Sequence, residues 1–148
     1  MADEKRAVLE ANERFYAGMN SLDVSDMDDV WMMDAGAVCV HPGREAIFGY
    51  ERIRESWTAI FAATDSMTIA QRGERVTLAG DVSWVNCTEI ISMMTEEGLA
   101  SAAAQATNIF RRSSTGGGGE DDKRWRMIVH HASPIPFMAE EEWPELIN

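Results

Sequence analysis

A chain of 148 residues with a formal net charge of −12 is long enough to bury one hydrophobic core, and too acidic to suit nucleic acid or anionic lipid as a partner. Hydrophobic residues make up 45% of it, which is typical of a globular protein rather than a disordered one. No apolar run is long enough to cross a membrane and the charged first residues do not resemble a secretion signal, so we expect a cytoplasmic protein.

The N-terminal part of the sequence predicts three helices. In residues 5–20, apolar side chains recur at helical spacing with charged ones between them, which is the pattern of an amphipathic helix. A short second helix is expected after Ser25, whose hydroxyl suits an N-cap. Gly49-Tyr50 opens a third helix with one apolar stripe. Each helix therefore has one face to bury against another layer of structure.

The rest of the sequence indicates β-structure. A short strand is expected at residues 37–41, where Pro42-Gly43 stops it. Residues 67–71 and 75–78 are either two short strands or one bent strand. Three longer strands, rich in β-branched and aromatic residues, are expected at 82–94, 99–112 and 124–133.

Helices followed by hairpin-connected strands predict a single α+β domain over residues 1–136, followed by an acidic tail at 137–148. The glycines at 116–119 fall in a loop between two strands and lack the Lys-Ser/Thr of a phosphate-binding loop. Long strands under a helical cover bend readily, and a bent sheet leaves a pocket between itself and the helices.

Three stretches of the sequence resemble the SnoaL-like branch of the nuclear-transport-factor-2-like superfamily, which has a ketosteroid-isomerase-like fold. They are ERFYAGMNSLDVSDMDDVWMMDAGAVCVHPG, GYERIRESWTAIF, and the closing pair TNIFRR and RWRMIVHHASP, which together cover about residues 7–136. The resemblance implies a cone-shaped domain in which a strongly bent antiparallel or mixed sheet wraps around three helices and encloses a pocket. It also implies a homodimer formed through the outer face of the sheet.

Members of this superfamily include steroid and polyketide isomerases or cyclases, hydratases, small-ligand binders and oligomerisation modules, so the fold leaves the function open. The resemblance places His41 where the steroid isomerases carry their catalytic carboxylate, at the turn after the first strand. An imidazole can act as a general base near neutral pH. The alternative is a structural histidine that bonds a neighbouring group where the strand ends.

The isomerases also need hydrogen-bond donors for an enolate oxygen. The resemblance places Tyr16 or its neighbour Phe15 in the region of the tyrosine donor, and Asn108 on the strand that carries the second donor, an acid. The position of that acid is occupied by Ala106, which counts against an ordinary ketosteroid isomerase. Two other carboxylates near the site are interpreted as surface groups, Asp34 at a helix end and Glu89 as an edge charge.

Large apolar side chains suit a flat hydrophobic ligand, although they suit core packing and a dimer interface equally well. We expect pocket contacts from Phe15, Trp31, Trp57, Trp84, Met127 and His131. His130 and His131 are adjacent on a strand, so at most one of them can line the pocket. Strict alternation groups His131 with Trp125, Met127 and Val129.

No motif predicts a metal or a cofactor, because the histidines lack partners at ligand spacing and the two cysteines, Cys39 and Cys87, are better explained as packed thiols. Three functions remain open. The first is a dimeric small-molecule-binding domain with a hydrophobic pocket, and the second is an isomerase, cyclase or hydratase with His41 as its base. The third is an oligomerisation module, since the last strand resembles that of the association domain of calcium/calmodulin-dependent kinase II.

Overall fold

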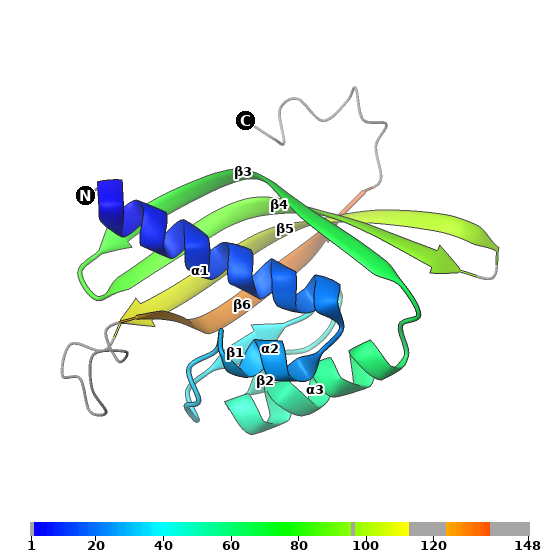
Figure 1. The fold of residues 1–148 in the computed structure, drawn as a ribbon, viewed down its shortest axis with the longest axis horizontal. Coiled ribbons are helices and arrows are strands. Elements are labelled where there is room, and N and C mark those ends of the chain that lie inside the picture. Colours follow the sequence, from blue (N-terminus) through cyan, green and yellow to red (C-terminus); the bar gives the residue numbers. More distant parts are fainter. Residues whose placement is uncertain (1, 96, 113–123, 137–148) are drawn as a thin grey trace.

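The computed structural model describes residues 2–95, 97–112 and 124–136, in which three helices and six strands form one layered unit (Figure 1). The helices are α1 (Ala2–Ser21), α2 (Val24–Asp28) and α3 (Tyr50–Ala62). The strands are β1 (Val38–Val40), β2 (Ile47–Phe48), β3 (Met67–Ala79), β4 (Val82–Thr95), β5 (Gly98–Arg112) and β6 (Trp125–Ile135). The predicted order of elements is confirmed, with β2 as an addition. The predicted glycine loop and acidic tail lie outside the described residues.

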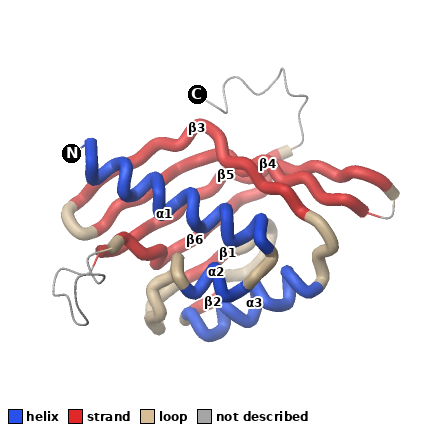
Figure 2. The backbone as a smooth tube through the Cα atoms, viewed as in Figure 1, coloured by secondary structure: helices blue, strands red, loops and turns tan. Residues whose placement is uncertain are grey.

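The strands form one mixed sheet in the order β2-β1-β6-β5-β4-β3. All neighbours pair antiparallel except β1 and β6, which run parallel. Helix α1 lies across one face of this bent sheet, α3 lies beside β1 and β2, and α2 packs against α1 and α3 (Figures 1 and 2). The predicted α+β class and the bent sheet covered by helices are therefore confirmed, and the sheet stays open because β2 and β3 are its edges.

The helix ends follow local backbone chemistry. Helix α2 is capped by Asp23, whose side chain accepts a hydrogen bond from the Ser25 backbone N–H at 3.0 Å. The expectation that Ser25 is the cap is wrong, because the longer-reaching carboxylate two residues earlier takes that N–H. Helix α3 begins after Gly49, whose φ of 87° lies in the left-handed region that favours glycine.

Residues 67–79 form one bent strand, which decides between the two predicted alternatives. The pairing of β3 with β4 shifts by one residue between Arg72 and Arg75, and Gly73 within this bulge has a φ of 66°. Such a bulge increases the local twist of a strand. It helps β3 and β4 to curve over α1.

A second bulge decides which residues of β6 face the helices. Ile109 pairs with Val129 but Phe110 pairs with Met127, so Ile128 is an extra residue on β6. Strict alternation is broken there, and Met127 and His130 both point inward while His131 is exposed. The predicted grouping of His131 with Met127 is therefore wrong.

The strand also continues past its predicted end, because Pro134 lies within β6. Beyond His131 the strand has no β1 partner on its outer side, so β6 is an edge strand there, which is where a sheet tolerates proline.

The core lies between α1, α3 and the inner face of the sheet. Phe15 is fully buried at its centre and its ring packs against Tyr16, Trp31 and Trp57 at centroid distances of 4.9, 6.3 and 5.9 Å. Both cysteines are buried and free, which confirms their interpretation as packed thiols. No helix in the described ranges is both long enough and apolar enough to span a bilayer.

The substitution Phe15→Ala is expected to lower the free energy of unfolding by about 3–5 kcal/mol, because it leaves a cavity at the centre of the core. Urea denaturation followed by tryptophan fluorescence measures this loss. The matched control is Phe48→Ala, since Phe48 is 62% exposed and its loss should change stability by less than about 0.5 kcal/mol. Equal losses at both positions would contradict the described core.

Candidate functional site

A pocket of about 210 Å³ lies where the end of α1, helix α3, the loop after β1 and strands β3, β4 and β6 meet. Its wall is largely apolar. It is lined by Met19, His41, Pro42, Arg44, Trp57, Ile60, Met67, Glu89, Ile91, Met93 and His130. An apolar pocket with a few converging polar groups is the usual form of a small-molecule site. A larger surface groove of about 450 Å³ near Phe48 contains no buried carboxyl or imidazole.

Glu89 is the one buried carboxyl in this wall. It lies on β4, its side chain is 1% exposed, and it stands opposite Ala104 of β5, whose small side chain leaves room for it. Burial raises the pKa of Glu89 from the usual 4.5 to about 7, and the hydrogen bond from Tyr16 opposes part of this rise. The interpretation of Glu89 as an edge charge is therefore wrong.

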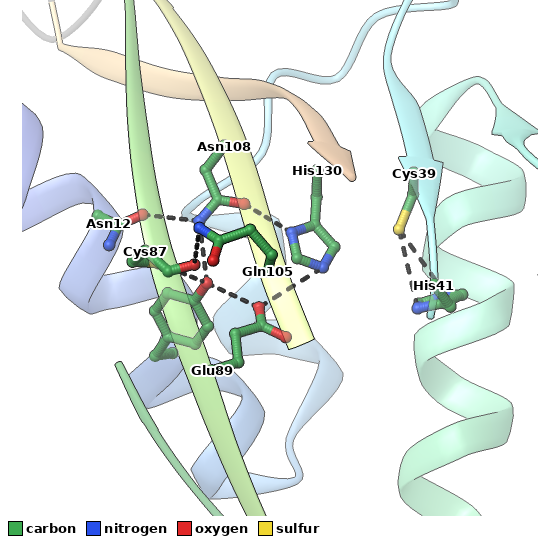
Figure 3. Close-up of polar contacts among 9 residues, drawn as sticks. Asn12, Cys39, His41, Cys87, Glu89, Gln105, Asn108 and His130 are labelled. Atoms are coloured by element: carbon green, nitrogen blue, oxygen red, sulfur yellow. Dashed lines mark hydrogen bonds and ion pairs between the residues drawn. The ribbon is translucent and has the colours of Figure 1, made fainter. Parts of the chain in front are cut away.

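A chain of side-chain hydrogen bonds connects Glu89 to His130 behind the pocket wall (Figure 3). The Tyr16 hydroxyl donates to Glu89 Oε2 at 2.7 Å and accepts from Asn108 Nδ2 at 3.0 Å. Asn108 Nδ2 also donates to Asn12 Oδ1 at 2.8 Å, and Asn108 Oδ1 lies 2.6 Å from His130 Nδ1. The predicted pair Tyr16 and Asn108 thus contact each other. Tyr16 also contacts Glu89, and Asn108 also contacts His130. Neither Tyr16 nor Asn108 lines the pocket itself.

His130 is fully buried on the inner face of β6. Burial lowers its pKa from 6.5 to about 3, and the nearby His41 and His131 contribute to this shift. Its ring is therefore neutral at pH 7. His130 Nε2 lies 3.9 Å from Glu89 Oε2, and both residues line the pocket.

His41 lines the same pocket from the loop after β1. Its Nε2 lies 3.0 Å from Ser56 Oγ, and the Ser56 hydroxyl already donates its proton to the Ile53 carbonyl at 2.7 Å. His41 Nε2 must therefore be the donor in its contact with Ser56. Burial and the nearby Arg44 lower the pKa of His41 to about 4. Both observations favour the structural alternative for His41.

Neither cysteine is suited to nucleophilic chemistry. Cys39 Sγ lies 3.8 Å from His41 Nε2, but burial raises the pKa of the Cys39 thiol to about 12. Burial likewise raises the pKa of Cys87, which contacts the Tyr16 hydroxyl at 3.3 Å, to about 11. Since the thiolate is the reactive form, both remain inert thiols at neutral pH.

The residues expected to contact a ligand fall into three groups. Trp57 lines the pocket, and its ring packs edge-on against His41 at 4.7 Å between centroids. Three of them form the core behind the pocket, namely Phe15, Trp31 and Met127. Trp84 and His131 point to the opposite face of the sheet, since their strand neighbours Val85 and His130 face inward.

From the sequence, Glu89 was interpreted as an edge charge, and His131 was expected in the pocket in place of its neighbour His130. Of these residues, Glu89 and His130 line the pocket wall. A signal for Glu89 existed, because alternation along β4 places it on the same face as the buried Val85 and Cys87. For His130 the alternation pointed the wrong way, because the bulge at Ile128 cannot be read from the residue types. In the described part of the chain, no three potential metal-ligating side chains gather in one place.

Residues 8–138 match the model of the SnoaL-like domain, and the chain belongs to this family. A "putative dehydratase from the NTF2-like family" of Streptomyces avermitilis is similar, with 29% identity, a TM-score of 0.80, and coverage of 92% of this chain and 99% of that one. A "putative calcium/calmodulin-dependent protein kinase type II association domain" of Thiobacillus denitrificans has 26% identity, a TM-score of 0.71, and coverage of 85% and 93%.

A nuclear-transport-factor-2-like protein of Salmonella enterica shares the fold at 12% identity, with a TM-score of 0.79 and coverage of 95% of this chain and 97% of that one. No curated protein matches the sequence.

The raised pKa of Glu89 predicts a pH-dependent difference in stability between the wild type and Glu89→Gln. A carboxyl whose pKa is about 7 when folded and 4.5 when free stabilises the fold fully below pH 4.5, and this contribution is lost as pH rises to 7. Relative to wild type, Glu89→Gln should gain about 3 kcal/mol of unfolding free energy across that range. Urea denaturation at a series of pH values measures it.

The protonation of His41 and His130 destabilises the fold at acid pH in both proteins. Taking the difference between Glu89→Gln and wild type therefore cancels this contribution. The control is Glu13→Gln on the exposed side of α1, for which the difference should stay flat. A flat difference for Glu89→Gln as well would mean that Glu89 is solvated.

Proposed function

We propose that this SnoaL-like domain binds a small, mainly apolar molecule in the pocket beside Trp57 and transfers a proton to or from it. The observation that carries the proposal is the buried carboxyl of Glu89 on the pocket wall, with a pKa of about 7. An acid–base catalyst works best when its pKa is close to the working pH. Glu89 meets this condition, whereas His41 and His130, with pKa values of about 4 and 3, are weak bases.

The reaction class that fits is proton abstraction next to a carbonyl, or the addition or elimination of water, as in isomerases and lyases. Such reactions need one group that alternates between acid and base, and a dry pocket that holds the substrate against it. The similarity to the "putative dehydratase" at 29% identity supports the lyase side of this class. Glu89, and not His41, takes the role of the proton carrier in this proposal.

Enolisation can be tested without knowing the natural substrate. Wild-type protein is expected to accelerate hydrogen–deuterium exchange at the α-carbon of members of a panel of one-ring ketones in D₂O, measured by proton NMR. Glu89→Gln keeps the shape and removes the base, so exchange should fall by about 10²–10⁴-fold. The rate with wild type should rise with pH around the pKa of Glu89, about 7, as the carboxylate forms.

His41→Ala is the comparison variant, and its exchange should keep the same midpoint because Glu89 is intact. If His41→Ala loses the exchange activity and Glu89→Gln keeps it, the general base is His41 and not Glu89. Thermal melting of each variant separates a loss of chemistry from a loss of folding. If wild type neither exchanges any ketone of the panel nor eliminates water from any hydroxy-carbonyl compound, the catalytic part of the proposal fails. Only the binding of a small molecule then remains.

A second function, self-association, is favoured by the face of the sheet opposite the helices. Trp84, Ile109 and Val129 are paired in register across β4, β5 and β6, so they form one apolar row on that face. All three are only half-buried. Contiguous exposed apolar side chains mark protein–protein contacts. We propose that a second copy of the chain covers this row in a homodimer, and the similarity to the kinase association domain at 26% identity supports it.

Ile109→Lys is expected to weaken self-association by more than about tenfold, because it places a charge in the middle of the apolar row. Sedimentation velocity over a range of protein concentrations measures the change, and circular dichroism checks that the variant is folded. The control is Ala17→Lys on the exposed side of α1. A wild-type protein that is monomeric at all concentrations would refute the dimer.

A further inference from the structure

The hydrogen bonds around Asn108 determine which nitrogen of His130 carries its proton. Tyr16 has one hydroxyl proton, and its 2.7 Å contact with Glu89 uses it. The Tyr16 oxygen is then an acceptor, so the Asn108 group 3.0 Å from it must be the NH₂. The second proton of that NH₂ goes to Asn12 Oδ1. The amide oxygen of Asn108 therefore faces His130.

An amide oxygen can only accept a hydrogen bond, so His130 Nδ1, at 2.6 Å, must be protonated. A neutral imidazole carries one proton, and Nε2 is consequently left with a lone pair. That lone pair is on the side of the ring that faces Glu89. Asn108 is thus a positioning residue, which fixes the tautomer of His130 from behind the pocket wall.

Glu89 Oε2 and His130 Nε2 are 3.9 Å apart, which is too far for a hydrogen bond between them. A single hydroxyl oxygen can lie about 2.8 Å from both atoms at once. Placed there, it accepts a hydrogen bond from the proton on Oε2 of a protonated Glu89, whose remaining lone pair accepts from Tyr16. The hydroxyl then donates its own proton to the lone pair of His130. The two side chains then form one donor and one acceptor for the same ligand group.

We propose that the pocket recognises an uncharged, mainly apolar compound of about one ring through a hydroxyl group held between Glu89 and His130. This inference rests on the proposed small-molecule function and names the class of its ligand. The volume of about 210 Å³ and the walls of Trp57 and Met93 suit the apolar body.

The other charged and titratable groups near this point favour an uncharged ligand. Two of these groups lie next to Glu89, namely Tyr16 of α1 and Cys87 of β4. Burial raises the pKa values of both, so both are uncharged at neutral pH. Cys39 lies beside His41, which is held neutral, and the exposed Arg44 lies at the mouth. From β6, His131 lies on the opposite face. A ligand carboxylate next to Glu89 would meet no buried cation among these groups and would be repelled once Glu89 ionises.

The test uses p-cresol and p-xylene, which have the same shape and differ by a hydroxyl in place of a methyl. Their dissociation constants are measured by ligand-observed NMR at a pH below the Glu89 pKa of about 7. In Glu89→Met, the ratio of p-xylene to p-cresol dissociation constants should fall by about tenfold, the effect of one buried hydrogen bond. His130→Phe should show the same fall, and Glu13→Met on the exposed side of α1 should leave the ratio at its wild-type value.

A ratio that is equal in wild type, Glu89→Met and His130→Phe would overturn the hydroxyl site while leaving the apolar pocket in place. Failure of both probes to bind would overturn the proposed function together with this inference. The tautomer is measured separately in the folded wild type by ¹⁵N NMR of histidine, with His130→Phe used for assignment. Protonation at Nδ1 is expected for His130. Protonation at Nε2 would overturn the role given to Asn108.

Discussion

A carboxyl group surrounded by apolar side chains must be protonated or hydrogen-bonded, because an isolated carboxylate in such surroundings costs several kcal/mol. Glu89 is in this situation, and much of the polar interior is arranged around it. Tyr16 supplies its one strong hydrogen bond, Asn108 orients Tyr16, and Asn12 completes the bonding of Asn108. A carboxyl that the core tolerates only in this way is costly to bury in its charged form, which is why its presence on a pocket wall points to function.

The same constraint links the sheet to the site. The bulge at Ile128 turns His130 inward, where it meets the amide oxygen of Asn108. Under strict alternation from Met127, Val129 and His131 would face inward in place of His130, and the register with Asn108 would change. Bulges often re-aim a side chain next to a site. In this chain the bulge brings a neutral imidazole to within 3.9 Å of the buried carboxyl.

The resemblance to the steroid isomerases implied an acid on β5, and this chain has Ala106 at that position. The absence of that acid does not leave the interior without a carboxyl group. The interior nevertheless contains an acid, because Glu89 enters it from the neighbouring strand β4, above the small side chain of Ala104. A carboxyl in the same region from another strand is compatible with proton chemistry, although it is not the steroid isomerase arrangement. Family membership alone would not have distinguished these cases.

The sequence by itself determined the α+β class and the order of the helices and long strands, because helical and alternating hydrophobic patterns are local. It also led to the correct family through motifs spread along the chain. Only the tertiary structure decided which face each side chain of β6 occupies, since a one-residue bulge reverses the alternation. Likewise, the pKa of Glu89 and the tautomer of His130 depend on groups up to 96 positions apart in the chain, such as Asn12 and Asn108. Such contacts leave no periodic signal, because they arise when separate elements pack together.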